Sequence, residues 1–215
     1  MKQQLFASKF FFCMLTLLYL LTASCNNESS SGSSSADSAS ATPGTTDTTQ
    51  KANMPADTAT VATVPLAAHA EAVLSGTYPD TTVEGTLKFD TAKGKVKMKL
   101  EITVPKKAGK SVAVHIHEHG DCADTAKMAH GHWNPTNAQH GKWGSGSFHS
   151  GDIGNVKLDA KGKGTLTLET DLWTLGGSPE KNILGKAIIV HGGVDDYKSQ
   201  PAGNAGTRIG CGVIH

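Results

Sequence analysis

Short stretches in which apolar and polar residues alternate fill the C-terminal part of the chain. Alternation with a period of two predicts strands that bury one face, and turn sequences such as residues 91–94 and 159–162 separate the stretches. No segment keeps the periodicity of a helix. The eight stretches are residues 70–74, 83–89, 96–104, 112–117, 156–158, 165–168, 187–191 and 209–214. They predict an all-β fold, an eight-stranded antiparallel Greek-key sandwich or barrel.

Two predicted connections, residues 118–154 and 192–207, are longer than hairpins need. Both are rich in Gly, His, Asp and Pro and poor in aliphatic residues. Long loops in a compact domain are usually either functional or disordered. Because five of the ten histidines lie in the first loop, we interpret these as two long functional loops.

The N-terminus has the features of an export signal. Lys2 supplies a positive charge, residues 10–21 form an apolar run too short to span a bilayer comfortably, and small residues lead into Cys25. We predict a signal peptide over residues 1–24. The arrangement resembles the lipobox of bacterial lipoproteins, in which this cysteine is lipidated and anchors the protein to a membrane. Plain cleavage without lipid is the alternative.

Residues 25–66 consist mostly of Ser, Thr, Ala, Asp and Gly. Such a segment buries too little apolar surface to offset its ordering entropy. We predict a lipid-anchored flexible linker, although a tail without a role fits the composition equally well. The remaining residues 67–215 are long enough for one domain with its own core. The formal net charge of +1 gives no reason to expect a nucleic acid partner.

Four cysteines are present. Cys13 is removed with the signal and Cys25 is the candidate lipidation site, so Cys122 and Cys211 remain in the domain. Exported proteins meet oxidising conditions, and two remaining cysteines therefore predict one disulfide.

Histidines supply the candidate metal ligands. His115 and His117 are two residues apart on a predicted strand, so their side chains share a face. Two exposed histidines on a solvated sheet face are the alternative. His191 ends an apolar predicted strand and is either a further ligand or a buried core histidine.

The first long loop carries a second group of candidate ligands. His132, His140, His149 and Asp152 follow one another at spacings of eight, nine and three residues. Three imidazoles and a carboxylate suit four-coordinate zinc, and metal binding would supply folding energy to a loop with few apolar residues.

Six segments resemble copper/zinc superoxide dismutases, and together they extend over residues 70–215. They are HIHEHGDC at 115–122, GHWNP at 131–135, HG at 140–141, HSGDIGNV at 149–156, IVH at 189–191 and GNAGTRIGCGVI at 203–214. Cys122 directly after Gly-Asp resembles the bacterial branch. The resemblance implies an enzyme that converts superoxide to dioxygen and hydrogen peroxide, with one copper and one zinc per subunit.

The resemblance also implies a role for each matching residue. The copper ligands would be His115, His117, His132 and His191, and the zinc ligands His132, His140, His149 and Asp152. His132 would therefore bridge the two metals and act in catalysis together with Arg208, which lines the family's active channel. Asp195 would link a copper ligand to a zinc ligand, and Cys122 would pair with Cys211. Members are often dimers, so a homodimer is a candidate assembly.

Four other histidines match no ligand of the family: His69, His119, His130 and His215. We interpret them as ordinary surface or terminal residues. In the loop 192–207, Lys198 is the only basic side chain before Arg208, which predicts weaker electrostatic guidance of substrate than in animal enzymes.

The expected role is protection of the cell envelope from superoxide, in the periplasm or at the outer membrane. Three alternatives compete with it. A copper/zinc store or chaperone would need no channel arginine and no bridging histidine, and a copper-only dismutase would lack zinc ligands. In a non-enzymatic adhesion sandwich the histidines would be incidental.

Overall fold

The computed structural model describes residues 64–215. The predicted signal peptide, the lipidation site Cys25 and the linker up to residue 63 lie outside the described residues. Within residues 64–215, no helix has both the length and the apolar character that a membrane crossing requires.

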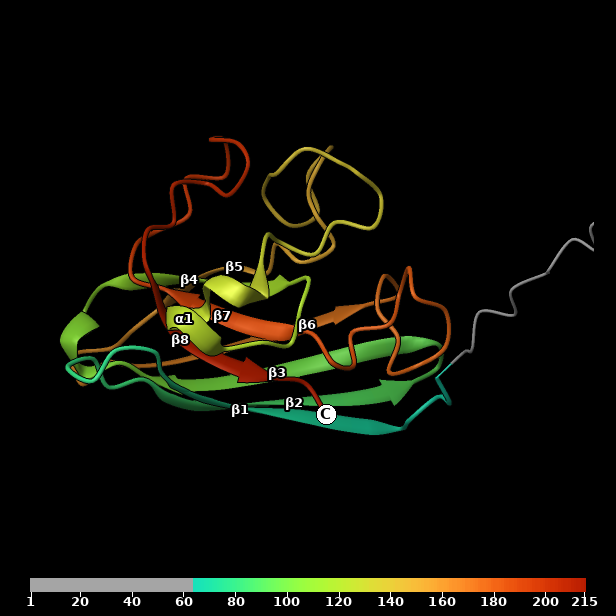
Figure 1. Cartoon of the computed structure of the whole chain (residues 1–215), viewed down its shortest axis with the longest axis horizontal. Coiled ribbons are helices and arrows are strands. Elements are labelled where there is room, and N and C mark those ends of the chain that lie inside the picture. Colours follow the sequence, from blue (N-terminus) through green and yellow to red (C-terminus); the bar gives the residue numbers. More distant parts are fainter. Residues whose placement is uncertain (1–63) are drawn as a thin grey trace, which may run out of the picture. The chain divides into compact units, whose positions relative to one another are not determined.

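Eight antiparallel strands form a single sheet (Figure 1). Their bounds are His69–Gly76 (β1), Glu84–Ala92 (β2), Lys95–Thr103 (β3), Ser111–His117 (β4), Gly154–Lys157 (β5), Lys163–Thr170 (β6), Ala187–His191 (β7) and Arg208–Val213 (β8). All eight strands predicted from alternation are confirmed. Their ends differ by a few residues: β1, β2 and β6 continue past the predicted stretches, whereas β3, β5 and β8 end one residue before the buried Val104, Leu158 and Ile214.

The strand order is β5-β4-β7-β8-β1-β2-β3-β6. The two terminal strands of this order approach each other, since Gly164 of β6 lies against Val156 of β5 and Leu158. The sheet is therefore a nearly closed barrel, which confirms the predicted fold class. In Figure 1 the strands β1, β2 and β3 lie on one side and β4, β7 and β8 on the other.

The barrel interior holds the apolar side chains of the alternating pattern. In β3 every second residue is buried, and the two largest buried side chains, Phe89 and Trp173, make an edge contact with ring centroids 6.4 Å apart. Full burial of an aliphatic or aromatic side chain stabilises a fold by roughly 1.5–3 kcal/mol. This core stabilises the barrel strands from which the two long loops extend.

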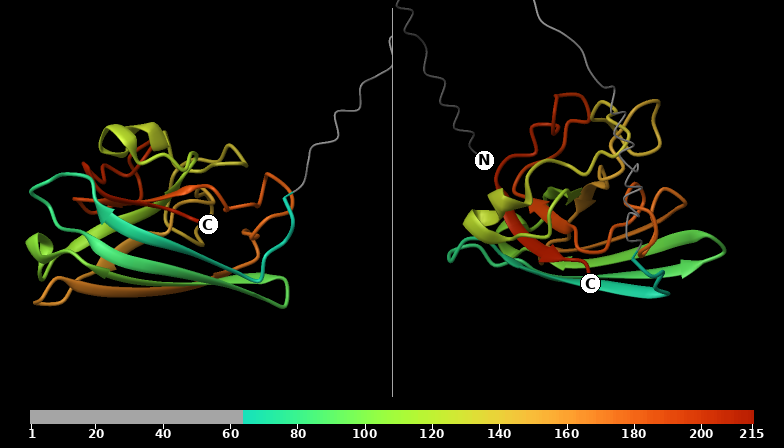
Figure 2. Two further views of the ribbon diagram at one scale, coloured as in Figure 1. Left: turned by 60° about the horizontal axis from the view of Figure 1, so that its bottom comes forward. Right: turned by 45° about the vertical axis from the view of Figure 1, so that its right-hand side comes forward.

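Strands β4, β7 and β8 are buried on both faces, whereas β1, β2, β3 and β6 have one exposed face. Val114 and Ile116 face the core, whereas His115 and His117 face outward and are still 0% and 1% exposed. The two long loops rise on this outer side of the barrel (Figures 1 and 2). The alternative of two exposed histidines on a solvated sheet face is therefore wrong.

Short helical turns occur at Pro105–Lys107 (η1), Ala123–Ala126 (α1) and Lys127–Ala129 (η2). Ala126 and Ala129 pack with Ile189 in a small apolar cluster on the outer side of β7 and β8. Asp124, Thr125 and Ala126 have positive φ angles, and no glycine in this segment predicts that conformation.

The disulfide between Cys122 and Cys211 is present and spans 89 residues of sequence. It joins the beginning of the long loop to β8. The chain-entropy model gives a closed loop of this length a stabilisation of about 4 to 5 kcal/mol. The pairing predicted from the cysteine count is confirmed.

Candidate metal centre

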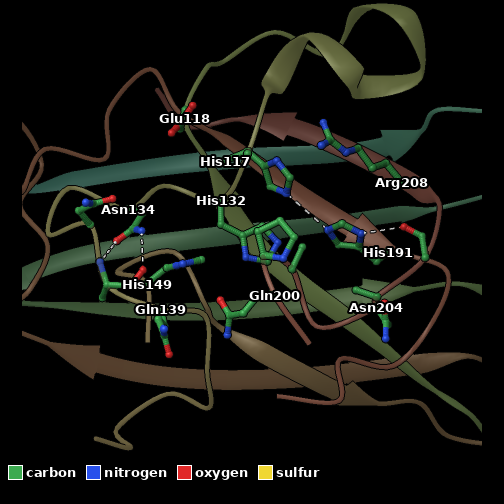
Figure 3. Close-up of a pocket in the computed structure, with 17 residues that line it drawn as sticks. His117, Glu118, His132, Asn134, Gln139, His149, His191, Gln200, Asn204 and Arg208 are labelled. Atoms are coloured by element: carbon green, nitrogen blue, oxygen red, sulfur yellow. Dashed lines mark hydrogen bonds between the residues drawn. The ribbon is translucent and has the colours of Figure 1, made fainter. Parts of the chain in front are cut away.

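Four buried histidines converge on the outer side of β4 and β7, and Figure 3 labels His117, His132 and His191 among them. Each offers a ring nitrogen, and the four nitrogens lie within 4.8 Å of one another. None of the side chains is more than 6% exposed. The set consists of His115 and His117 of β4, His132 of the loop 118–154 and His191 of β7. We call it the strand cluster.

The backbone brings His132 to the strand. His132 forms an isolated bridge with His117, and the amide of Trp133 donates to the Ile116 carbonyl at 2.8 Å. The Ile116 amide in turn donates to the Gly151 carbonyl at 2.9 Å. A Cβ atom on Gly151 would overlap with the Ile116 carbonyl, so this approach requires glycine.

A second group is organised by one carboxylate and shares His132 with the first. The Asp152 oxygens lie 2.8, 3.0 and 3.2 Å from the Nδ1 atoms of His132, His140 and His149. All four residues are buried, and their ligand atoms lie within 4.8 Å of one another. We call this set the loop cluster. His132 therefore presents one ring nitrogen to each cluster.

Hydrogen bonds orient two imidazoles of the strand cluster. Nδ1 of His117 donates to the His130 carbonyl at 2.8 Å, and Nδ1 of His191 donates to the Gly206 carbonyl at 3.2 Å. Both Nε2 atoms then face inward and lie 3.4 Å apart. A metal-binding histidine usually donates its other nitrogen in this way.

Asp195 connects the two clusters from outside. Its oxygens accept hydrogen bonds from Nε2 of His115 and Nε2 of His140, each at 2.9 Å. Gly203 has a φ of +63°, and a Cβ atom there would overlap with the Asp195 carboxylate and the His140 ring. The loop 192–207 thus packs its backbone directly on this link.

Four buried ring nitrogens have no hydrogen-bond partner in the described part of the chain. They are Nε2 of His132 and Nδ1 of His115, His140 and His149. The Asp152 oxygens near the last two are close without hydrogen-bond geometry. An unpaired buried polar atom is costly. These atoms are the ones that face the two cluster centres, so the residues fit one metal ion in each.

Burial keeps three histidines of the strand cluster, His117, His132 and His191, uncharged. It lowers the pKa of His132 to about 4 and that of His191 to about 3, and it lowers the pKa of His117 further. Burial alone would raise the pKa of Asp152, but hydrogen bonds from the His132 ring and from the backbone amides of Gly141 and His149 outweigh it, and that pKa is lowered. Neutral imidazoles and an ionised carboxylate are the forms that bind metals.

Arg208 is half-buried beside the strand cluster and lines the cavity that leads to it (Figure 3). The cavity has a volume of about 680 Å³. The guanidinium donates to the carbonyls of Ala126, at 2.6 Å, and His130, at 2.6 Å. Burial lowers its pKa, and an arginine nevertheless keeps its charge in proteins.

The sequence-based ligand sets are confirmed by this geometry, because every predicted ligand lies in its expected cluster. Sequence reasoning missed the His130 carbonyl, which accepts from both His117 and Arg208. It also missed Gln200, whose side chain hydrogen-bonds the backbone of His140 on both sides. Neither contact has a signal in the residue pattern.

Comparison with known proteins agrees with this site. The family model for copper/zinc superoxide dismutase (SODC) matches residues 83–214. A copper/zinc superoxide dismutase 2 of Aquifex aeolicus is 46% identical over 108 residues, and the match covers 48% of this chain and 63% of the relative. The chain thus matches slightly under two thirds of that relative's length.

Two further relatives are covered almost completely. A copper/zinc superoxide dismutase of Talaromyces marneffei is 34% identical, with 67% of this chain and 96% of the relative covered. The crystal structure of the clock protein EA4 matches this chain with a TM-score of 0.61 and 33% sequence identity. The match covers 70% of this chain and 95% of the EA4 chain.

Metal-free protein should lose stability as the pH falls below about 6.5. The pKa values of His132 and His191 are lowered to about 4 and about 3, against about 6.5 in an unfolded chain. Between these pKa values only the unfolded chain binds the protons, and protonation therefore favours unfolding. The contribution of each histidine to the free energy of unfolding is present above pH 6.5 and is lost as the pH falls toward 4 for His132 and toward 3 for His191. We expect a loss of about 2 kcal/mol per histidine between pH 7 and 5. Urea unfolding with a chelator present measures it, and equal free energies at both pH values would contradict it.

Proposed function

The chain belongs to the copper/zinc superoxide dismutase family, and on that premise we propose that it dismutates superoxide to dioxygen and hydrogen peroxide. The single observation that carries the proposal is the position of His132. Its Nδ1 faces the loop cluster and its Nε2 faces the strand cluster, and both environments are buried. A bridging imidazole couples one ion to the other, which a storage protein does not need.

The donors of each cluster indicate which metal it holds. Four imidazoles suit copper, which when bound supplies one-electron chemistry between Cu(II) and Cu(I). Three imidazoles and one carboxylate suit zinc in a closed, four-coordinate structural site. A complete zinc set argues against a copper-only dismutase.

His132 is the residue that we propose to hold and release a proton. Dismutation of two superoxide anions consumes two protons, so a proton donor must lie beside the reaction site. Nε2 of His132 has no partner in the described part of the chain, and Nδ1 is fixed by Asp152 at 2.8 Å. A proton can therefore be carried at Nε2 without rotation of the ring.

Arg208 supplies a fixed positive charge at the cavity. We propose that it attracts the superoxide anion and orients it in front of His132. Unit charges about 5 Å apart attract by roughly 3 kcal/mol at an effective dielectric constant near 20. Among the cavity-lining residues Arg208 is the one basic residue other than histidine, and Glu118 is the acidic one. The positive electrostatic field in the cavity is therefore confined to the surroundings of Arg208.

Asp195 is proposed as a positioning residue. Its two hydrogen bonds fix the ring orientations of His115 and His140, one in each cluster. Partners of this kind set the tautomer and the basicity of metal-bound histidines.

We also propose that the protein works in the cell envelope, exported and attached to a membrane through a lipidated Cys25. The disulfide supports export, because such bonds form in oxidising compartments. One relative, 34% identical, is described as an extracellular superoxide dismutase of Caenorhabditis elegans. An anchored enzyme would remove superoxide close to the membrane that needs protection.

The variant His132→Ala tests the proposed activity. Parent protein loaded with copper and zinc should catalyse superoxide decay, measured after a rapid pulse of superoxide. The variant should lose at least about 100-fold in rate, because it lacks the proton-carrying ring, and should bind zinc more weakly. His69→Ala, an exposed histidine outside both clusters, is the control. Full activity of His132→Ala would disprove the bridging role.

The salt dependence of the rate tests Arg208. Arg208→Gln should slow catalysis by about tenfold at low ionic strength, because attraction of the anion is lost. The difference should shrink as salt screens the charge in the open cavity. Arg208→Lys, which keeps the charge, separates attraction from the hydrogen bonds to the Ala126 and His130 carbonyls. Identical salt profiles of parent and Arg208→Gln would remove Arg208 from steering.

Fractionation tests the proposed anchor. In a bacterial host with a lipoprotein pathway, the parent should appear in the membrane fraction and label with a fatty-acid analogue. Cys25→Ala should abolish the label and move the protein out of that fraction. Cys13→Ala is the matched control, because Cys13 lies in the predicted signal. An unlabelled parent that is recovered free of membranes would leave plain cleavage as the correct interpretation.

A further inference from the structure

A third group of potential ligands lies outside both clusters, among residues 64–215. Glu118, His119 and His130 each offer one ligand atom, and these atoms lie within 4.8 Å of one another. The rings of His119 and His130 have centroids 4.4 Å apart and an interplanar angle of 79°. All three residues are exposed. The sequence analysis interpreted both histidines as ordinary surface residues, because neither matches a metal ligand of the family.

The backbone holds these three residues together without help from their side chains. The Glu118 amide donates to the Gly131 carbonyl at 3.1 Å, and the His119 amide donates to the Ala129 carbonyl at 3.2 Å. The two segments thus run side by side just beyond the bridge between the strand and the loop. Preorganised ligands lose less entropy when they bind an ion.

No other group competes for these side chains. None of the three forms a side-chain hydrogen bond or ion pair within the part of the chain that the structure describes. Lys186, the basic residue whose charge acts on Glu118, places its Nζ over the Trp133 ring, 5.1 Å from the centroid. The carboxylate of Glu118 therefore stays available.

The backbone of His130 is strained. Its φ of 61° and ψ of −143° lie in a region that glycine occupies almost alone. Such a conformation persists where neighbouring contacts impose it, and it is commonest at functional sites. Here the His130 carbonyl accepts from Arg208 at 2.6 Å and from His117 at 2.8 Å. Glycine would adopt these φ and ψ angles with less strain than histidine. The presence of histidine therefore indicates that its imidazole has a function of its own.

We propose that Glu118, His119 and His130 form a third metal site, which binds a divalent transition-metal ion, Cu²⁺ or Zn²⁺. Two imidazoles and one carboxylate are a donor set that zinc uses when a fourth position stays open, and Cu²⁺ binds nitrogen donors more tightly still. Glu118 lines the cavity, and Figure 3 shows its side chain turned away from the imidazoles of His117 and His132. The site lies at the cavity rim and exchanges its ion with solvent.

Zinc titration of the full chain, already loaded with copper and zinc and freed of loose ions, tests the proposal. Calorimetry and elemental analysis should find one additional zinc per chain. His119→Gln and His130→Gly should each weaken this binding by at least about tenfold. His69→Gln and His215→Gln, which remove exposed histidines elsewhere, should leave it unchanged. His130→Gly also relieves the backbone strain, so loss of the fold cannot account for its effect.

A second measurement locates the added ion. Side-chain NMR of the histidines should show zinc-dependent shifts of the His119 and His130 rings, while the rings of His69 and His215 stay in place. The proposal is overturned if the loaded parent takes up no additional zinc, or if His119→Gln and His130→Gly keep it. Because zinc is counted above the amount already held, the result does not depend on whether the chain dismutates superoxide.

Discussion

The imidazole of His132 is held between the Asp152 carboxylate and the other three histidines of the strand cluster, and the geometry of both clusters depends on it. Asp152 fixes its Nδ1 at 2.8 Å, and the bridge between His132 and His117 fixes the backbone. Nε2 then points at three nitrogens without a hydrogen-bond partner of its own. Such an arrangement is unfavourable unless a positive ion occupies the centre. Metal binding and the final shape of the loops are therefore one process.

The strands could be predicted from the sequence because their cores obey a period of two. Residues such as Met98 and Leu100 alternate with exposed positions and pair in a regular ladder. Strand β4 follows the same rule on one face only, since His115 and His117 are buried by loops that residue patterning does not describe. The ligands themselves could be found from motifs, because metal chemistry restricts which residues can occupy them.

The remaining features depend on tertiary contacts between segments far apart in the sequence. The positive φ angles of Asp124, Thr125 and His130 occur at residues that rarely adopt them, so no local propensity indicates the turns at Ala123–Ala129. The pairing of Glu118 with Gly131 places His119 beside His130, and neither histidine matches a metal ligand of the family. Sequence reasoning recovers what side-chain chemistry dictates and misses what backbone pairing imposes.

The two faces of strand β4 have different functions. Val114 and Ile116 point inward to the apolar core, and the neighbouring His115 and His117 point outward to the ligand clusters. Changes on the outer side can therefore accumulate without harming the interior that keeps the polypeptide folded. A duplicated copy could lose its ligands, lengthen its loops and acquire an unrelated role while inheriting an intact scaffold. Evolvability of this kind follows from one strand that serves a different purpose on each face.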